Sequence, residues 1–302
     1  MLVRAAGEGA PGDWMLKIDI LTAKERDIPP YFMLEGMIGF WRKAGADILV
    51  RPLGELSRTP DISFAHIART FVDEKALARE RAAAPVVNGR VADISKRRIS
   101  ANVVSRNDAY DGPVIVKTNL NYHGVPEEKD KPTAARAISS MLRRYGLKPP
   151  ARLMNALPFK HYPIYAAKAE APSWAWTDDR LVVEKFLPEK EGEDFVTRSW
   201  TFFGDRNYVT RLKSKSPLVK ATNHHFHEIL DAPPPGLASI RESLQIDYGK
   251  FDYVERDGAP VLLDVNTTVS MGARTERHMK LLDSFQGALY DYLESQAPGA
   301  CA

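Results

Sequence analysis

One segment near the C-terminal end of the chain constrains the fold more than any other, because it combines two strand patterns with a tight-turn signal. Residues 250–255 and 261–265 are rich in β-branched and aromatic residues, and Asp257 and Gly258 lie between them. Asp-Gly between two such runs is typical of an antiparallel β-hairpin. The hairpin would place the beginning of the first strand next to the end of the second, so that side chains at those ends share one site.

Three oxygen-bearing side chains occupy these strand ends. Asp252 lies near the beginning of the first strand, and Asp264 and Asn266 lie at the end of the second. Asp264 and Asn266 are two positions apart, so they point to the same face of a strand. Carboxylate and amide oxygens are ligands that Mg²⁺ accepts together with water and phosphate oxygens. The alternative is a solvated hairpin end, because Asp and Asn are common near turns, and both interpretations stay open here.

Two lysines stand in positions suited to phosphate. Lys117 ends the apolar run 113–116 and precedes a loop rich in Asn, Gly and charged residues. A lysine at a buried strand end, beside free backbone N–H groups, is an arrangement that binds phosphate, although a strand that simply reaches solvent at its lysine looks the same. The loop has no Walker A pattern, which excludes a P-loop. Lys96, followed by two arginines, is either a second phosphate contact or the basic start of a helix.

A fourth signal is the run 182–187, in which an apolar strand passes into Glu184, Lys185, Phe186 and Leu187. Such a segment can lie along an adenine ring and bond the edge of the base through its backbone groups. One of the three glutamates that follow would then accept hydrogen bonds from the ribose hydroxyls: Glu189, Glu191 or Glu193. A plain transition from a strand to a linker explains the same residues.

Taken in this order, the lysines, the Glu-Lys-Phe-Leu segment and the Asp, Asp and Asn of the hairpin resemble the ATP-grasp superfamily. The D-alanine–D-alanine ligases and the glutathione-synthetase-like ligases have the same order, and the resemblance spans about residues 93–274. It implies an α/β class of the α+β ATP-grasp type. In that fold, a small N-terminal open α/β subdomain precedes two α+β subdomains that clasp ATP between them.

The resemblance also implies a role for individual residues. Lys96 and Lys117 would hold the phosphates of ATP, and a loop over residues 119–124, with Asn119 and Gly124, would cover them. The adenosine would contact Glu184, Lys185, Phe186, Leu187 and Glu191. Mg²⁺ would be held by Asp252, Asp264 and Asn266, where Asp264 stands in place of a more usual Glu. Charge on the transferred phosphate would be stabilised by Lys250, Arg211 and Lys213.

The activity that the resemblance implies is an ATP-dependent ligase that joins a carboxylate to an amine. ATP would phosphorylate the carboxylate, a small molecule or peptide, and an amine would attack the acyl-phosphate, with release of ADP and phosphate. A kinase that phosphorylates a hydroxyl and a non-catalytic ATP-binding sensor are the alternatives. Candidates for substrate contact are His66, Arg198 and Arg274. The alternative is that His66 is a histidine of the core and that the two arginines are surface cations without a role in binding.

Patterns elsewhere predict the remaining organisation. We expect an irregular extension over residues 1–14 and three subdomains over residues 15–92, 93–185 and 186–302. The first begins with a strand over 16–20, a helix around Met33 to Trp41 and a strand over 47–50. Later elements are a helix over 134–145, a strand pair near 164–167 and 181–183, a hairpin over 195–203 and 208–212, and a last helix over about 275–293. The cluster of His224, His225 and His227 favours a polar loop over a zinc site.

Composition excludes several other classes of protein. The 302 residues include 42 Lys and Arg against 39 Asp and Glu, so a net charge of +3 argues against a nucleic-acid binder. No apolar run approaches the roughly 20 residues of a membrane helix, and the first residues lack the apolar core of a secretory signal. Cys301 is the only cysteine, which fits a reducing, cytoplasmic compartment. The oligomeric state stays open, with a homodimer possible.

Overall fold

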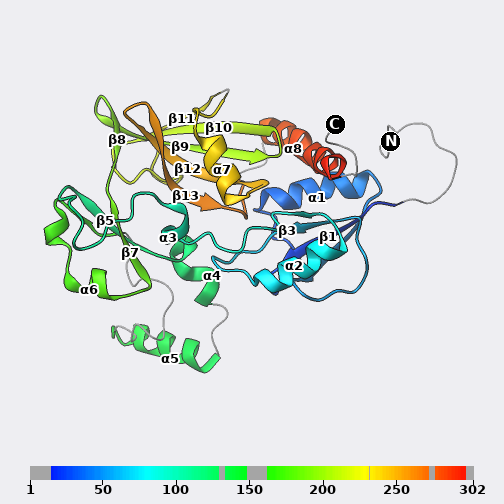
Figure 1. Ribbon diagram of the computed structural model, residues 1–302, viewed down its shortest axis with the longest axis horizontal. Coiled ribbons are helices and arrows are strands. Elements are labelled where there is room, and N and C mark those ends of the chain that lie inside the picture. The colour runs from blue at the N-terminus through cyan, green and yellow to red at the C-terminus, as the bar shows by residue number, and fades with distance from the viewer. Residues whose placement is uncertain (1–14, 129–132, 148–161, 231, 272–275, 297–302) are drawn as a thin grey trace.

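A computed structural model describes residues 15–128, 133–147, 162–230, 232–271 and 276–296. The described chain forms three β-sheets with helices packed around them, which confirms the mixed α/β class (Figure 1). The predicted extension over residues 1–14 lies outside the described residues. None of the described helices combines the length and the apolar content needed to cross a lipid bilayer.

The first sheet has four parallel strands in the order β2-β1-β3-β4. Its strands are β1 (Lys17–Thr22), β2 (Asp47–Pro52), β3 (Ile62–Ala65) and β4 (Val86–Val87), and two helices connect them, α1 (Met33–Lys43) and α2 (Glu74–Ala83). β1 and β3 are buried along nearly their whole length, as is typical of parallel strands that are covered on both faces. The Asp73 side chain accepts from the N–H groups of Lys75 and Ala76 and thereby starts α2.

The second, small sheet is antiparallel, with β5 (Val114–Thr118) between β6 (Ile164–Tyr165) and β7 (Leu181–Lys185). The strands expected near residues 164–167 and 181–183 were predicted to pair with each other. In the structure, each of them pairs with β5 instead. Side chains of β5 point alternately to the two faces of the sheet. Val114 and Val116 enter an apolar core on one face, whereas Lys117 lies on the other face. Between β4 and β7, the described residues also form six helices, five of them short: α3 (Lys96–Ile99), η1 (Asn121–Gly124), α4 (Val125–Glu128), α5 (Thr133–Arg144), η3 (Lys168–Glu170) and α6 (Ser173–Thr177).

The third, large sheet is also antiparallel and has the order β11-β10-β9-β12-β13, with β8 beside β9. Its strands are β8 (Glu189–Glu191), β9 (Asp194–Phe203), β10 (Arg206–Ser214), β11 (Phe226–Leu230), β12 (Tyr248–Arg256) and β13 (Ala259–Asn266). Aromatic residues of one face pack under α7 (Leu237–Leu244), among them Trp200 and Phe251. β11 contains His227, so part of the histidine cluster expected in a loop belongs to a strand, where its backbone pairs with Leu212.

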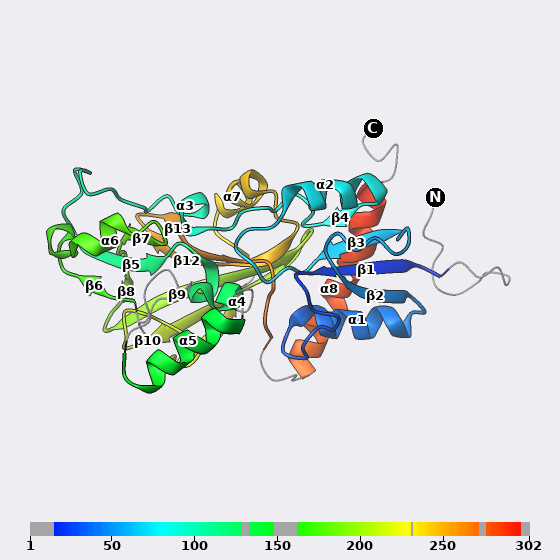
Figure 2. The same cartoon turned by 90° about the horizontal axis from the view of Figure 1, so that it is seen from below.

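The last helix, α8 (Glu276–Ser295), returns to the first sheet (Figures 1 and 2). Leu282, Phe285 and Leu289 share a buried core with α1, and Gly36 lies so close that a Cβ there would be 2.6 Å from Leu282 Cδ1. Phe203 and Tyr248 from the large sheet enter the same core. The C-terminal helix, predicted as part of region 186–302, therefore packs on the N-terminal unit and connects it to the large sheet.

Candidate active site

A cavity of about 370 Å³ lies between the small sheet and the large sheet. Part of its lining is apolar and includes Ile115, Phe186, Leu187 and Val254. Another part is charged: five lysines and two aspartates line the cavity, namely Lys96, Lys117, Lys185, Lys220, Lys250, Asp252 and Asp264. An apolar wall next to a concentration of lysines suits a ligand with a flat ring at one end and phosphates at the other.

The predicted hairpin forms, and its register brings the polar residues together. Lys250 pairs with Asn266 and Asp252 pairs with Asp264 across β12 and β13, so the four side chains lie on one face of the sheet. The register shifts directly after Asp252, and Leu263 is the extra residue of this bulge. Because of the bulge, both Leu263 and Asp264 line the cavity, which strict alternation would not allow.

Ion pairs hold the two aspartates. Lys96, which is 3% exposed, pairs with Asp264, and Lys250 Nζ lies 3.0 Å from Asp252 Oδ1. Burial raises the pKa of the Asp264 carboxyl, but Lys96, Lys117 and Lys250 outweigh that effect, and the net pKa lies below its usual value. The pKa of Lys250 is raised, chiefly by the charge of Asp252. The site thus keeps carboxylates and ammonium groups charged together.

A second buried ion pair crosses the small sheet. Lys117 Nζ lies 2.6 Å from Glu184 Oε2, and the two side chains are 11% and 3% exposed. The other carboxylate oxygen, Glu184 Oε1, is buried without a hydrogen-bond partner. Glu184 therefore lies beside the lysine at the end of β5, and it retains one oxygen able to accept a hydrogen bond.

The donor set at the hairpin fits a hard cation. Asp252 and Asp264 supply carboxylate oxygens and Asn266 supplies an amide oxygen, which are the donors that Mg²⁺ accepts. Within the described residues, no group of three or more His, Cys, Asp and Glu side chains is placed to hold a metal ion. Two carboxylates with one amide are compatible with that result, and a cation held by them would take its remaining oxygen ligands from water and phosphate.

The segment after β7 lies against the apolar wall. The Lys185 N–H donates to the carbonyl of Asn102 and the Phe186 N–H donates to the carbonyl of Pro113, both at 2.8 Å. These two N–H groups are already used by the protein. Lys185, Phe186 and Leu187 all line the cavity.

Four residues expected near the ligand are placed elsewhere by the pleat of the large sheet. Arg198 and Arg211 are register partners on β9 and β10, and Arg198 pairs with Tyr253, one position away from Asp252. They consequently lie on the face opposite Lys250 and Asp252. The side chains of this face form their own ion pairs: Arg198 with Glu189, and Arg211 and Lys213 with Glu191. None of Arg198, Arg211, Lys213 and Glu191 lines the cavity.

Other residues reach the cavity without having been expected there. The β10–β11 connection lies along it and contributes Lys220. Tyr162 lines it from the segment before β6, and Ser199 of β9 donates to Asp252. Lys220 lies in a stretch without strand or helix periodicity. Its positive charge, close to Pro217, is the only sequence feature that could have pointed to a role in the site. A single charged residue is too common a feature to select one lysine.

The loop after β5 is held down rather than open. The Asn119 carbonyl accepts from the Lys96 N–H, and its side chain accepts from the Arg97 N–H, so Asn119 fixes the start of α3. Two residues later, the Asn121 side chain donates to the Val265 carbonyl at 3.0 Å and to Asn266 Oδ1 at 3.4 Å. Gly124 ends the short helix η1 with a φ of +72°, in the left-handed region that favours glycine.

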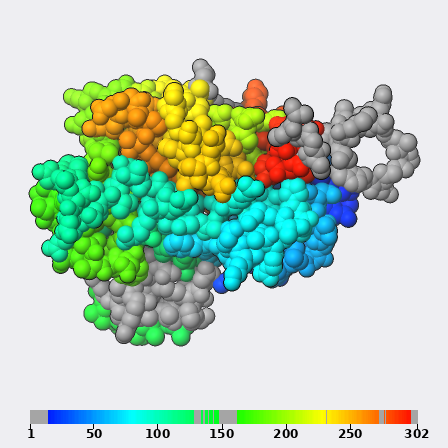
Figure 3. Space-filling model, viewed as in Figure 1, coloured from blue at the N-terminus to red at the C-terminus, as the bar shows by residue number. Residues whose placement is uncertain are grey.

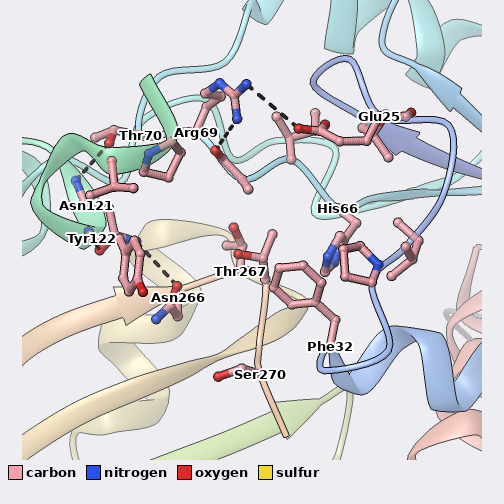
Figure 4. Close-up of a pocket in the computed structure, with 18 of the residues that line it drawn as sticks. Glu25, Phe32, His66, Arg69, Thr70, Asn121, Tyr122, Asn266, Thr267 and Ser270 are labelled. Carbon is pink, nitrogen blue, oxygen red and sulfur yellow. Dashed lines mark hydrogen bonds and ion pairs between the residues drawn. The ribbon is translucent and has the colours of Figure 1, made fainter. Parts of the chain in front are cut away.

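A second cavity, of about 470 Å³, adjoins the end of β13 (Figure 4). It lies at the carboxyl ends of β1 and β3, where ligands bind in open parallel sheets. Figure 4 shows Asn121, Tyr122 and Asn266 on one side of it and His66 with Phe32 on the other. Asp264 lines the first cavity and Asn266 lines the second, so the end of one strand borders both.

Two buried groups in the second cavity lack partners. His66 is 4% exposed, and neither of its ring nitrogens has a hydrogen-bond partner. Burial lowers the pKa of His66 to about 3, against a smaller opposing effect of Glu25, so the ring is neutral. Glu127 Oε1 accepts from the N–H and the hydroxyl of Thr70, whereas Glu127 Oε2 is buried without a partner. Buried polar groups without partners are rare unless a ligand supplies the partner.

Of the two described residues that were considered for substrate contact, His66 lines the second cavity. Arg198 lies on the far face of the large sheet, as described above. Arg274 lies outside the described residues. Glu127 and Thr70 were not expected, since a glutamate in a charged loop and a threonine before a strand-like segment carry no distinguishing pattern.

The comparisons with known proteins rest on structure alone, because no protein family model and no curated protein matches the sequence. Similar solved structures do exist. One is a RimK domain protein ATP-grasp from Sphaerobacter thermophilus, at 12% identity and TM-score 0.47, covering 92% of this chain and 99% of that chain. Another is a RiPP-associated ATP-grasp ligase from Chryseobacterium gregarium, at 12% identity and TM-score 0.44, covering 94% and 98%.

The chain is similar to ATP-grasp proteins. The D-alanine–D-alanine ligase from Bacillus anthracis is also similar, at 13% identity and TM-score 0.43, with 93% of this chain and all of that chain covered. At such identities and TM-scores, the likeness assigns neither a substrate nor a role to any residue here. Those assignments depend on the two cavities and the side chains that line them.

Proposed function

We propose that the protein is an ATP-dependent ligase that activates a carboxylate as an acyl-phosphate and joins it to an amine. The observation that carries this proposal is the adjacency of the two cavities across Asp264 and Asn266. One cavity has the lysines and carboxylates suited to a magnesium–polyphosphate, and the other has unpartnered groups suited to an organic substrate. A phosphoryl group transferred at this border passes from one ligand to the other without crossing water.

ATP would occupy the first cavity, between regions 93–185 and 186–302. The adenine would lie on the apolar wall beside Phe186 and Leu187. Lys117 and Lys96 would contact the phosphates of ATP. Both lysines are buried and already paired with carboxylates, so they are fixed in position before the nucleotide binds. Lys220 replaces Arg211 as the candidate for the terminal phosphate, because it lies in the cavity and Arg211 does not.

Asp252, Asp264 and Asn266 would hold Mg²⁺. A bound magnesium ion supplies charge neutralisation between phosphate oxygens, which lowers the cost of bringing an anionic carboxylate to the phosphorus. Lys250 lies beside this set, 3.0 Å from Asp252, and would stabilise charge on the transferred group. Lys96 would exchange its contact with Asp264 for a phosphate oxygen.

The chemistry has two balanced steps. An oxygen of the substrate carboxylate forms a bond to the γ-phosphorus of ATP, and the bond from that phosphorus to the β–γ bridging oxygen breaks, releasing ADP. The amine nitrogen then forms a bond to the acyl carbon, phosphate leaves with the electron pair of the acyl C–O bond, and the amine loses a proton. The lysines act mainly in the first step, in which charge moves from the γ-phosphate to ADP.

The second cavity favours an amine as the acceptor over a hydroxyl. The buried oxygen Oε2 of Glu127 has no partner, and Thr70 already saturates the other oxygen of that carboxylate. A buried carboxylate is stabilised by a cation more than by a neutral donor, so the amine would bind here as an ammonium group and lose one proton to the Glu127 carboxylate before its nitrogen attacks. His66, neutral and unpartnered, would orient the same or the second substrate by a hydrogen bond.

The test is Mg²⁺-dependent ATP turnover in the presence of hydroxylamine and a panel of carboxylates, amino acids and peptides. We expect ADP and phosphate as products, and a hydroxamate that reports the acyl-phosphate. Asp264→Ala and Asn266→Ala should abolish turnover, whereas the control Asp257→Asn, at the hairpin turn, should retain it. AMP as the product, phosphate transfer to a hydroxyl, or full turnover by the Asp264 variant would contradict the proposal.

A further inference from the structure

The second cavity carries a surplus of negative charge. Three carboxylates line it, those of Glu25, Asp27 and Glu127, and Arg69 is the one cation among its described lining residues. The Arg69 guanidinium donates to the Ala68 carbonyl at 2.7 Å and lies 3.9 Å from Glu25 Oε1, toward which it is turned (Figure 4). Such a lining attracts a cationic ligand and repels a ligand that brings a further carboxylate.

The carboxylate that ATP phosphorylates would lie outside this surplus, at the border of the two cavities. Lys250 and the proposed magnesium ion would offset its charge there, on the side of the first cavity. Arg69 and Glu127, in contrast, line the second cavity and not the first. A carboxylate on the acceptor itself would therefore meet three like charges and a guanidinium that is already in contact with acceptors.

Aromatic side chains border the same cavity on two sides (Figure 4). Phe32 lies on one side, where its ring centroid is 4.7 Å from that of His66, and Tyr122 lies on the other. The Tyr122 side chain is 69% exposed, so its ring is not part of a packed core. Aromatic faces bind flat apolar groups and also attract ammonium groups.

The two aromatic sides are both fixed to the chain at the end of β13. Tyr122 has a φ of +45°, which a residue other than glycine keeps only where its surroundings enforce it. Asn121 enforces it here, because its side-chain oxygen accepts from the Tyr122 N–H and its nitrogen donates to the Val265 carbonyl. On the other side, the N–H of Met33, directly after the phenylalanine, donates to the Val269 carbonyl at 2.9 Å. One continuous segment thus sets the separation of the two rings.

We infer that the acceptor is a primary amine that carries an aromatic ring and no carboxylate. Its ammonium group would contact Glu127 Oε2, which is buried without a partner, and its ring would lie between Phe32 and Tyr122. This inference rests on the proposed function and specifies its second substrate. The alternative is an α-amino acid, whose carboxylate Arg69 would have to hold.

The experiment compares three ligands on the full chain by isothermal titration calorimetry, with Mg²⁺ and the β,γ-imido analogue of ATP and again without nucleotide. Phenethylamine has the amine and the ring, phenylalanine adds a carboxylate, and butylamine lacks the ring. We expect phenethylamine to bind about ten-fold or more tightly than either of the others, because only this ligand combines both contacts without the repulsion.

Two variants test the two contacts separately. Glu127→Gln keeps an oxygen for Thr70 but removes the charge, and it should weaken phenethylamine binding about ten-fold or more. Tyr122→Asn, chosen because Asn tolerates a positive φ, should weaken phenethylamine several-fold and leave butylamine within about two-fold. A purely structural role of Tyr122 would weaken both amines equally. Glu276→Gln, an exposed carboxylate of α8, is the matched control.

Phenylalanine or butylamine binding as tightly as phenethylamine would overturn the inference, and so would unchanged phenethylamine binding by the Glu127→Gln variant. If that variant unfolds, the three ligands on the unaltered protein and the Tyr122→Asn variant decide. Failure of the unaltered protein to bind the ATP analogue would instead overturn the proposed function. The titrations without nucleotide measure the second cavity separately, so the two failures are distinguishable.

Discussion

Lys117 and Glu184 form an ion pair of 2.6 Å between β5 and β7, where both side chains are almost fully buried. The pair lies on the face of the small sheet that is turned toward the large sheet, opposite Val116 and Val183. Each charge is tolerated there because the other is present.

Removing one partner of the ion pair between Lys117 and Glu184 should therefore destabilise the folded protein. We expect Glu184→Ala to lower the free energy of unfolding by about 3–5 kcal/mol, because Lys117 is left buried without an anion. Glu276→Ala, which breaks an exposed pair with Lys280, should cost less than about 1 kcal/mol. Chemical denaturation followed by circular dichroism measures both variants, and similar small losses for the two would contradict the buried pair.

Lys220, in the connection that lines the first cavity, and Arg211, on the far face of the large sheet, should respond differently to substitution. Lys220→Ala should weaken ATP binding about ten-fold or more, because its ammonium group lies in the cavity. Arg211→Ala should leave ATP affinity within about two-fold, because Arg211 is paired with Glu191 and Glu228 on the far face. Titration calorimetry with a non-cleavable ATP analogue distinguishes them, and a larger effect at Arg211 would reverse the assignment.

The ion pair between Lys96 and Asp264 predicts a competition between lysine and metal. With Lys96→Met, Asp264 loses its nearest cation, so Mn²⁺ used as a probe should bind several-fold more tightly without nucleotide. ATP should bind more weakly to the same variant, because the proposed contact between Lys96 and phosphate is lost. Electron paramagnetic resonance measures free Mn²⁺ directly. Unchanged Mn²⁺ affinity would show that Asp264 does not bind the metal.

His66 should make stability depend on acid. Its pKa is about 3 in the folded protein and near 6.5 when unfolded, so between these values the unfolded state binds more protons. Stability is therefore lost as the pH falls below 6.5, by roughly 2 kcal/mol at pH 5 relative to neutral pH. His66→Gln should flatten this part of the curve, and the control His225→Gln should not. Denaturation midpoints at several pH values test it, and an unchanged slope would mean that His66 does not remain neutral.

Local patterns predicted most of the elements correctly. The hairpin of β12 and β13 forms where Asp257 and Gly258 placed its turn, and the strands and helices of the first sheet lie within a few residues of their expected positions. These features depend on alternation, helical spacing and turn chemistry, which act over a few residues. Lys96, Lys117 and Asp264 could be proposed for the same reason, since each lies at or near the end of an element with a clear pattern, whereas Asp252 lies in the middle of β12.

The face of each side chain on a long strand was harder to predict. Arg211 and Lys250 were both expected near phosphate, yet pairing of β10 with β9 and of β9 with β12 puts them on opposite faces of one sheet. A shift of one residue in register reverses the face, and the register depends on partners far away in the sequence. The bulge at Leu263 is a further case, because it changes the face of the residues that follow it.

The sequence by itself determined the elements and the residue types that can hold a polyphosphate, because those depend on neighbours within one strand, helix or turn. Only the tertiary structure decided which of them meet. It brought Lys220 from an irregular connection to the first cavity and paired Glu127 with Thr70 beside His66 in the second. It also packed α8 onto α1, at the other end of the chain. Such contacts join residues that are far apart in the sequence, 57 positions for Thr70 and Glu127, and no local period records them.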